Sequence, residues 1–223
     1  EAVRIFPGKA LVRITGGHLR GRRLASMKGL EIRPTSDRVR EAVFDRIGQD
    51  LKGFQVVDLF AGTGALGIEA LSRGAERAVF VDRAAQALRL IEKNLNRCGL
   101  LHEAALIRKD LRRGLPKRLV AGTPHEALVF LDPPYRQGLI PPVLAALGES
   151  DMLAPGSLIV AETARDETLP VPTGALQFLD TRRYGDTCIH LLVCEARENG
   201  GLGKEENRSN EATETGKRLE RST

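Results

Sequence analysis

Short apolar runs alternate with longer amphipathic stretches through most of the chain. The runs are rich in Val, Leu, Ile and Phe, which is typical of strands that are buried on both faces of a sheet. The stretches after the first, second and fourth runs have the spacing of amphipathic helices. Because strands that alternate with helices form parallel sheets covered on both faces, this order predicts an α/β fold. Strands are expected at residues 55–60, 78–82, 104–110, 127–132 and 157–163, and two more flank RRYGD at residues 182–186, which gives a mostly parallel seven-stranded sheet.

The N-terminal part of the chain has a different pattern. Residues 1–34 are rich in Gly and Arg and hold short β-like pieces around a GHLRGRR turn, which predicts a small, basic, hairpin-like β appendage. Arg33 favours an extended end to this segment, because the residue before a proline avoids the helical region. Thr35 or Ser36 can then cap a helix. Its apolar positions Val39, Val43 and Ile47 lie four residues apart, and it is expected to end near Gly48.

Three segments follow from these patterns. A basic arm is predicted over residues 1–34, a single α/β domain over residues 35–195 and a disordered tail over residues 196–223. The tail holds six Lys or Arg, six Glu and almost no bulky apolar side chain. Such a segment cannot bury enough apolar surface to offset the entropy that ordering would cost.

Composition narrows the class of protein. No apolar run approaches the roughly 20 residues of a membrane helix, and the N-terminus lacks the apolar core of a signal peptide. The three cysteines have no metal-type spacing, so we expect reduced thiols in a cytoplasmic protein without a metal.

The net charge is +5, yet residues 1–40 alone hold ten Lys or Arg against three acids. This concentrated charge predicts a face that binds a polyanion such as nucleic acid.

A glycine-rich turn follows the first predicted strand in the sequence DLFAGTGALG. Gly62, Gly64 and Gly67 match the GxGxxG spacing of dinucleotide-binding proteins, so a nicotinamide-dependent oxidoreductase is one candidate. Asp58 and Phe60 precede the turn, however, and a carboxylate at that point would meet a pyrophosphate. It suits a cationic ligand, such as the amino group of a methionine moiety.

Two further acids end the second and third predicted strands. Asp82 can accept hydrogen bonds from both hydroxyls of a ribose, or it can cap the helix that follows. Asp110 can accept a hydrogen bond from an adenine amine, or it can serve only the local turn. The neighbours Arg83 and Leu111 are included in this predicted nucleotide site.

The fourth predicted strand ends in the sequence DPPY. An exocyclic amine of a nucleobase is a poor nucleophile, so a site that methylates it must accept hydrogen bonds from its N–H groups. Asp132 supplies a carboxylate, and the carbonyl of Pro133 supplies a second acceptor because Pro134 fixes the backbone. Tyr135 can stack on the flat face of the base. The chemistry is then mainly positioning and needs no metal.

These motifs together resemble a known family. Residues 55–135 resemble the class I S-adenosylmethionine-dependent methyltransferases that modify amino groups, with a Rossmann-like sheet, DLFAGTG as the cofactor loop and DPPY as the catalytic loop. RITGGHLRGRRL, GLEIRPTSDRVREAVFDRIG and YGDT at residues 184–187 are similar to the bacterial 16S ribosomal RNA methyltransferases that modify N2 of guanine 966. The similarity covers roughly residues 11–195.

The resemblance implies roles for the residues already singled out. S-adenosylmethionine would lie against Asp58, Phe60, Gly62, Gly64, Asp82, Arg83, Asp110 and Leu111, while Asp132, Pro133, Pro134 and Tyr135 would hold the guanine amine. Arg20, Arg22 and Arg23 would bind RNA phosphates, and Arg33, Thr35 and Arg38 would lie beside the mouth of the active site. The partner would be 16S ribosomal RNA, free or within the small subunit or an assembly intermediate of it, and the enzyme a monomer.

Other interpretations stay open at this point. DPPY chemistry also serves adenine N6 in DNA, although no insert here is long enough for the usual DNA-recognition region. A non-catalytic RNA-binding assembly factor could keep the same fold. Glu162 is a candidate to line the pocket, Tyr184 to pack against the catalytic loop and His18 to touch phosphate.

Overall fold

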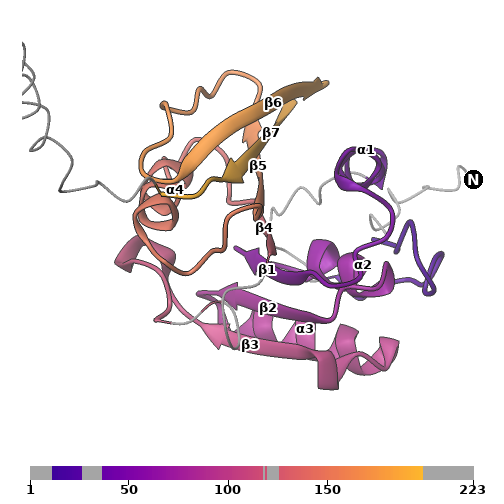
Figure 1. The fold of residues 1–223 in the computed structure, drawn as a ribbon. Coiled ribbons are helices and arrows are strands. Elements are labelled where there is room, and N and C mark those ends of the chain that lie inside the picture. The colour runs from indigo at the N-terminus through magenta and orange to yellow at the C-terminus, as the bar shows by residue number, and fades with distance from the viewer. Residues whose placement is uncertain (1–11, 27–36, 118, 120–125, 198–223) are drawn as a thin grey trace, which may run out of the picture.

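The computed structural model describes residues 12–26, 37–117, 119 and 126–197. Seven strands form one sheet in the order β3-β2-β1-β4-β5-β7-β6 (Figure 1). The first five are mutually parallel, and β7 runs antiparallel to both of its neighbours. The predicted mostly parallel seven-stranded sheet is therefore confirmed. The strands are β1 (Gln55–Leu59), β2 (Arg77–Asp82), β3 (Ala104–Arg108), β4 (Ala127–Leu131), β5 (Leu158–Ala164), β6 (Leu176–Tyr184) and β7 (Thr187–Cys194).

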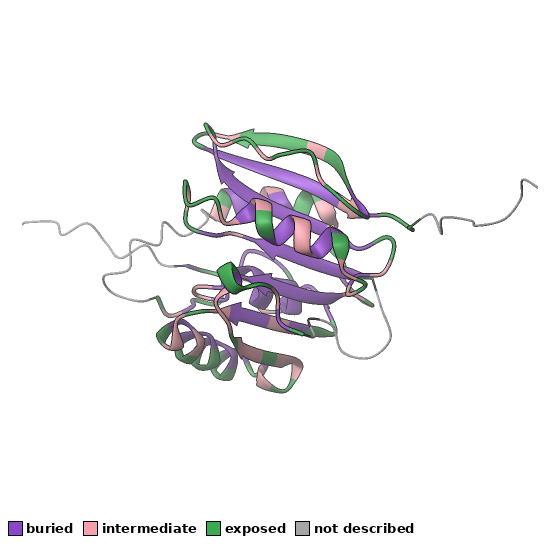
Figure 2. Ribbon diagram, turned by 90° about the vertical axis from the view of Figure 1, so that its left-hand side faces the viewer, coloured by how far each residue is buried: buried purple, intermediate pink, exposed green. Residues whose placement is uncertain are grey.

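Helices cover both faces of the sheet, as the sequence predicts. Alternate side chains of β1 point to opposite faces, so Val56 lies in one core with α1, α2 and α3, while Val57 lies in a second core with α4. In Figure 2 the buried strands lie beneath helices whose outer faces are partly or fully exposed. The helices are α1 (Asp37–Ile47), α2 (Ala65–Ser72), α3 (Ala85–Cys98) and α4 (Ile140–Glu149), with short 3-10 turns η1 (Leu101–Glu103) and η2 (Leu111–Arg113).

The helix ends have local causes. Helix α3 stops at Gly99, which has a φ of 75°, a left-handed conformation that only glycine adopts without a steric penalty. The N–H of Leu100 then bonds to the carbonyl of Leu95 at 3.0 Å, which closes the helix. None of the described helices is long and apolar enough to cross a membrane.

The described part of the predicted basic arm packs on the domain. Arg13 and Arg23 form an antiparallel bridge, and the N–H of Leu24 donates to the carbonyl of Val12 at 2.9 Å. The apolar side chains of Val12, Ile14 and Leu24 are buried in the core that α1, α2 and α3 share. Residues 12–26 thus form a turn closed by one antiparallel bridge, which we call the hairpin-like segment. Residues 1–11 and 27–36 lie outside the described part, so the β appendage predicted over residues 1–34 stays a prediction. That the arm forms a unit of its own stays a prediction.

A buried ion-pair network joins this segment to α1 and α2. The carboxylate of Glu69 is fully buried and accepts from Arg40 Nε and Arg73 Nη2, both at 2.7 Å. It also accepts from the backbone N–H of Thr15 at 3.2 Å. Arg73 in turn lies 4.4 Å from the ring centroid of Phe44. Buried charges need such partners, because a lone buried charge is very costly.

Candidate active site

The loops that carry the sequence motifs meet at one edge of the sheet. Leu59 pairs with Val81 on one side and with Leu131 on the other, and Leu131 pairs with Ala161. The segments after β1, β2 and β4 therefore leave the sheet side by side. Parallel α/β sheets bind their ligands at this carboxyl edge, so the predicted cofactor loop and catalytic loop are neighbours in space.

The cofactor loop turns sharply and is fastened at Asp82. Phe60 has a φ of 65°, which is unusual for a residue with a side chain, and Gly62 and Gly64 also have positive φ. The N–H of Gly62 donates to Asp82 Oδ2 at 3.0 Å, and the N–H of Ala84 donates to Oδ1 at 2.7 Å. Asp82 therefore fixes the glycine turn to the backbone at Ala84, the N-cap residue of α3, and its contact with a ribose stays a prediction.

Asp58 lies beneath the first turn of α2. Its side chain is buried, and Oδ2 accepts from the N–H of Gly67 at 3.0 Å. Burial, opposed by the Gly67 hydrogen bond and assisted by the nearby Asp82 carboxylate, raises the pKa of Asp58 to about 8. A Cβ on Gly67 would lie 2.4 Å from the Phe80 ring. The third glycine of the GxGxxG match thus serves close packing of helix on strand.

The catalytic loop leaves β4 at Asp132, which is half-buried. Pro133 is buried and Pro134 is exposed. Arg136 has a φ of 57°, and its N–H donates to Glu167 Oε1 at 2.7 Å. The guanidinium of Arg136 pairs with Asp166 at 3.0 Å. The two prolines and these contacts hold the loop on both sides of its tyrosine.

Tyr135 is held by two strands. Its hydroxyl donates to Glu162 Oε1 on β5 in a short hydrogen bond, and it lies 2.9 Å from Thr187 Oγ1 at the start of β7. Burial and the Glu162 carboxylate both raise the pKa of Tyr135 above its ordinary value. Pro133, Tyr135 and Glu162 line a pocket of about 110 Å³ whose lining does not include the cofactor loop. That Glu162 lines the pocket for the substrate therefore stays a prediction.

Comparison with known proteins places the chain in a family. Residues 12–193 match the family described as Conserved hypothetical protein 95. The chain belongs to this family. YlbH of Bacillus subtilis, provisionally named an rRNA methyltransferase, is 39% identical over 180 residues, which are 81% of this chain and 97% of YlbH. Ribosomal RNA small subunit methyltransferase D of Escherichia coli is 36% identical over 192 residues, 85% of this chain and 93% of that protein.

Solved structures agree with this membership. The structure of yhhF from Escherichia coli, provisionally named a methyltransferase, is 32% identical and has a TM-score of 0.73, with 84% of this chain and 99% of that chain covered. An RNA methyltransferase from Salinibacter ruber in complex with S-adenosyl-L-homocysteine has the same fold at 14% identity and a TM-score of 0.50, covering 77% of this chain and 99% of that one. The chain therefore has the class I methyltransferase fold, as predicted, and S-adenosylmethionine is the cofactor that its sequence predicts.

The residues at the cofactor loop fit that cofactor. Gly64 has a φ of 76°, which residues with a side chain rarely adopt, and a Cβ there would lie only 3.1 Å from Ile91, so the turn favours glycine at this position. Asp82, which already fixes Gly62, keeps the unused lone pairs of a carboxylate for a ribose diol. Asp58 offers a buried carboxyl group that a nearby cation would favour in its charged form. When bound, S-adenosylmethionine would supply an electrophilic methyl group.

The carboxylate of Asp110, which the sequence assigned to an adenine amine, already has a partner within the chain. Its carboxylate pairs with Arg112 Nη2 at 2.6 Å and accepts from the backbone N–H of Arg112 at 3.1 Å. The Arg112 side chain lowers the pKa of Asp110 to about 2. An adenine amine would have to share this carboxylate with Arg112. Leu111 is buried in the second core, and the backbone carbonyl of Arg83 accepts from Arg108 Nε at 3.3 Å.

The predicted RNA-binding arginines are spread over two elements. Arg20, Arg22 and Arg23 are exposed on the hairpin-like segment, and Arg38 is exposed on α1. Arg22 also donates to the carbonyl of Arg97 at the end of α3. Arg33 and Thr35 lie outside the described residues, so their predicted place at the mouth of the site stays a prediction. His18 Nδ1 lies 2.9 Å from the carbonyl oxygen of Ser72, which leaves Nε2 for phosphate.

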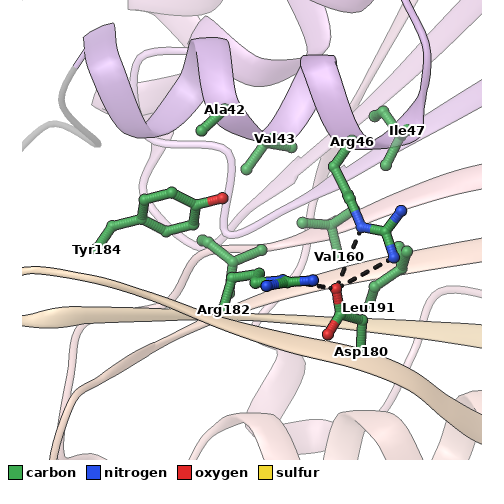
Figure 3. A pocket seen from close by; sticks show the side chains of 10 residues that line it. Ala42, Val43, Arg46, Ile47, Val160, Asp180, Arg182, Tyr184 and Leu191 are labelled. Carbon is green, nitrogen blue, oxygen red and sulfur yellow. Dashed lines mark hydrogen bonds and ion pairs between the residues drawn. The ribbon is translucent and has the colours of Figure 1, made fainter.

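Tyr184 packs elsewhere than on the catalytic loop. It points toward α1 and lines a groove with Ala42 and Val43 (Figure 3). On the rim of that groove, Arg46 and Arg182 share the carboxylate of Asp180, at 3.1 and 3.0 Å. The turn that follows Tyr184 nevertheless reaches the catalytic loop, through Thr187.

Asn94, which no sequence pattern singled out, connects the cofactor loop to the hairpin-like segment. Asn94 is fully buried on α3, and its Nδ2 donates to the carbonyl of Thr63 at 3.0 Å and to that of Ala25 at 3.1 Å. Its Oδ1 accepts from the N–H of Ala25 at 2.8 Å. A polar residue among the apolar positions Leu90, Ile91 and Leu95 is the signal that could have revealed it. Among the described residues, no cluster of His, Cys, Asp or Glu could hold a metal ion.

Proposed function

We propose that this chain transfers a methyl group from S-adenosylmethionine to the exocyclic N2 amine of a guanine in 16S ribosomal RNA, at the position that corresponds to guanine 966. The observation that carries the proposal is the DPPY loop at the end of β4, beside the glycine turn that follows β1. Relatives named as methyltransferases of small-subunit ribosomal RNA, which align with most of the chain, support the choice of RNA.

In this proposal the loop accepts a hydrogen bond from each of the two N–H groups of the guanine amine. The carboxylate of Asp132 accepts one, and the carbonyl of Pro133 accepts the other. The nitrogen lone pair is then directed away from the loop and toward the cofactor, which makes the transfer a matter of positioning. The amine becomes cationic as it gains the methyl group, and Asp132 is the acceptor placed to take its proton. Tyr135 covers the face of the base.

The RNA backbone would be held by the basic surface of the N-terminal segment. Arg20, Arg22 and Arg23 are exposed together there, and phosphate contacts by such side chains position a substrate without reading its sequence. The hairpin-like segment is fixed to the domain by its buried apolar side chains and by Asn94. A bound RNA would therefore have a defined position relative to the cofactor loop.

A transfer assay tests the proposed function. The purified chain is given tritiated S-adenosylmethionine with 16S ribosomal RNA, small subunits or duplex DNA, and labelled RNA is digested and analysed for N2-methylguanosine by mass spectrometry. We expect label in RNA or small subunits, at a single guanine. Label in DNA alone would show an adenine methyltransferase, and binding of RNA without transfer to any substrate would show a non-catalytic factor. Asp132→Ala should reduce transfer by at least about a hundredfold, as the loss of an essential positioning contact does.

A further inference from the structure

The hydroxyl of Tyr135 joins three segments that are distant in the sequence. It donates to Glu162 in β5 and lies 2.9 Å from Thr187 Oγ1, the first residue of β7. Thr187 belongs to the YGDT sequence, which the proposed reaction does not otherwise use. Three side chains from a loop and two strands thus meet at one phenolic oxygen.

Strand register explains why Glu162 and Thr187 reach the same point. Thr187 pairs with Ala164 across β5 and β7, and Glu162 lies two residues before Ala164. Side chains two residues apart on a strand, and side chains directly opposite on neighbouring strands, lie on the same face of a sheet. Glu162 and Thr187 therefore both project toward Tyr135 from that face. Since Glu162 is only 6% exposed, solvent does not compete for its carboxylate.

The three groups form a directed chain of hydrogen bonds. The single proton of the Tyr135 hydroxyl is donated to the Glu162 carboxylate, which can only accept. With its only proton donated, the phenolic oxygen can make further hydrogen bonds only as an acceptor. The Thr187 hydroxyl therefore donates to it. The end of the Tyr135 side chain is then fixed by two bonds in different directions. A swing of the side chain about the Cα–Cβ bond would move the hydroxyl oxygen and break both of them.

We propose that Glu162 and Thr187 are positioning residues that lock the ring of Tyr135 as a platform for the target base. The inference rests on the proposed function, in which Tyr135 covers the guanine. A ring that is already held loses little conformational freedom when the base stacks on it. The YGDT turn thereby takes part in substrate binding through Tyr135, without touching the substrate itself.

A cycle of variants tests the lock through kinetics. Thr187→Val removes the donor and keeps the shape of the side chain, and Glu162→Leu removes the acceptor. Each should lower kcat/KM for ribosomal RNA about tenfold, the effect expected for a lost hydrogen bond. Glu162→Gln keeps a carbonyl acceptor and should recover part of that loss. Affinity for S-adenosylmethionine, measured by calorimetry, should not change in any of them.

The decisive comparison is made without the hydroxyl. In a Tyr135→Phe background, Thr187→Val should cost nothing further, because both changes remove the same bond. Equal losses with and without the hydroxyl would overturn the proposal, as would losses confined to cofactor affinity. Thr181→Val is the matched control. Its hydroxyl joins β6 to His190 of β7 at 3.0 Å, away from the catalytic loop.

A second measurement separates this inference from the proposed function. The chain has only two tyrosines, so NMR of the protein with labelled tyrosine resolves Tyr135 from Tyr184. The Tyr135 side chain should keep a single χ1 rotamer in the unaltered protein and sample other rotamers in Thr187→Val and Glu162→Leu, because rotation about Cα–Cβ moves the hydroxyl away from both partners. Several rotamers in the unaltered protein would overturn the lock whether or not the protein methylates RNA. A single rotamer without any transfer to RNA would instead overturn the proposed function alone.

Discussion

Asn94 donates a hydrogen bond from its side-chain amide to the backbone carbonyl of Thr63, at 3.0 Å, inside the cofactor loop. The same amide group bonds twice to the backbone of Ala25, in the hairpin-like N-terminal segment. Thr63 stands between the two glycines of the cofactor turn, so one buried side chain on α3 fixes both the turn and the segment that carries the basic residues.

Replacing Asn94 should therefore affect cofactor binding as well as stability. Asn94→Leu would leave the carbonyls of Thr63 and Ala25 and the N–H of Ala25 without their partner, and buried groups left in this way cost about 1–3 kcal/mol each. We expect the affinity for S-adenosylmethionine to fall about tenfold in calorimetry, together with a lower midpoint of urea unfolding. Asn96→Leu, on the exposed side of the same helix, should change neither. A stability loss with full cofactor affinity would show that Asn94 does not position the turn.

Asp58 makes the stability of the fold depend on pH. Its pKa of about 8 lies above the ordinary value of 3.8, so between these values the folded state keeps a proton that the unfolded state has lost. The unfolded state then binds fewer protons, and stability must fall as pH rises. We expect a slope of about 1.4 kcal/mol per pH unit from this group between roughly pH 4 and pH 8. Urea unfolding at several pH values should show a smaller fall in Asp58→Asn, whose side chain does not titrate.

The same carboxyl group allows a test of its predicted contact with the cofactor. If the amino group of S-adenosylmethionine lies beside Asp58, binding should favour the carboxylate and release a proton at pH 7. Calorimetry in buffers with different ionisation enthalpies measures that proton directly. Asp58→Asn should bind without the release. Identical proton release in the unaltered protein and in Asp58→Asn would place the cation elsewhere.

Much of the fold could be predicted because its signals are local. The apolar runs before Asp82 and Asp132 are complete strands, and each motif follows its strand directly in the chain. The hydrogen bonds of Tyr135 to Glu162 and Thr187 do not have a local signal of this kind, because the alignment of β5 with β7 decides which side chains reach the hydroxyl. No spacing in the sequence encodes that register. Glu162 could be predicted as a pocket residue, but its partner could not.

The burial of charged residues could not be predicted from the sequence either, because it too depends on contacts between distant segments. Arg40 and Glu69 are charged residues in helices, and a charged side chain is normally assigned to the solvent-facing side. Helix α2, however, is buried from Leu66 to Ser72. The burial of Arg40 and Glu69 is possible only because α1 and α2 pack together and each charge meets its partner there. The carboxylate of Asp110, which the sequence assigned to a ligand, is paired with the neighbouring Arg112, and its contact with the cofactor stays a prediction.

The network around Glu69 should dominate the stability of the N-terminal half. Glu69→Ala would leave two buried guanidinium groups, those of Arg40 and Arg73, without their shared carboxylate. Removing one partner of a buried ion pair typically costs about 3–5 kcal/mol. Urea unfolding should show a loss of this size, whereas Glu76→Ala, an exposed acid on the loop after α2, should change stability by less than about 0.5 kcal/mol. A loss as small as that of the control would mean that the guanidinium groups find other partners.

The basic segment should be recognisable from the salt dependence of RNA binding. Each phosphate contact by a basic side chain releases counterions, so the logarithm of the binding constant falls with the logarithm of the salt concentration in proportion to the number of contacts. Replacing Arg20, Arg22 and Arg23 together with Ala should reduce that slope by about 2 to 3, measured by filter binding of a 16S ribosomal RNA fragment. Affinity for S-adenosylmethionine should stay unchanged.

The control for this prediction is a basic residue outside the hairpin-like segment. Arg77 is exposed at the start of β2. Arg77→Ala lowers the net charge of the protein without touching the hairpin-like segment, so it separates local contacts from general attraction to the RNA. If the slope per arginine removed were the same for Arg77 as for the three arginines, the segment would be only part of a diffuse positive field. A slope that changes only with Arg20, Arg22 and Arg23 would identify the segment as a phosphate-binding surface.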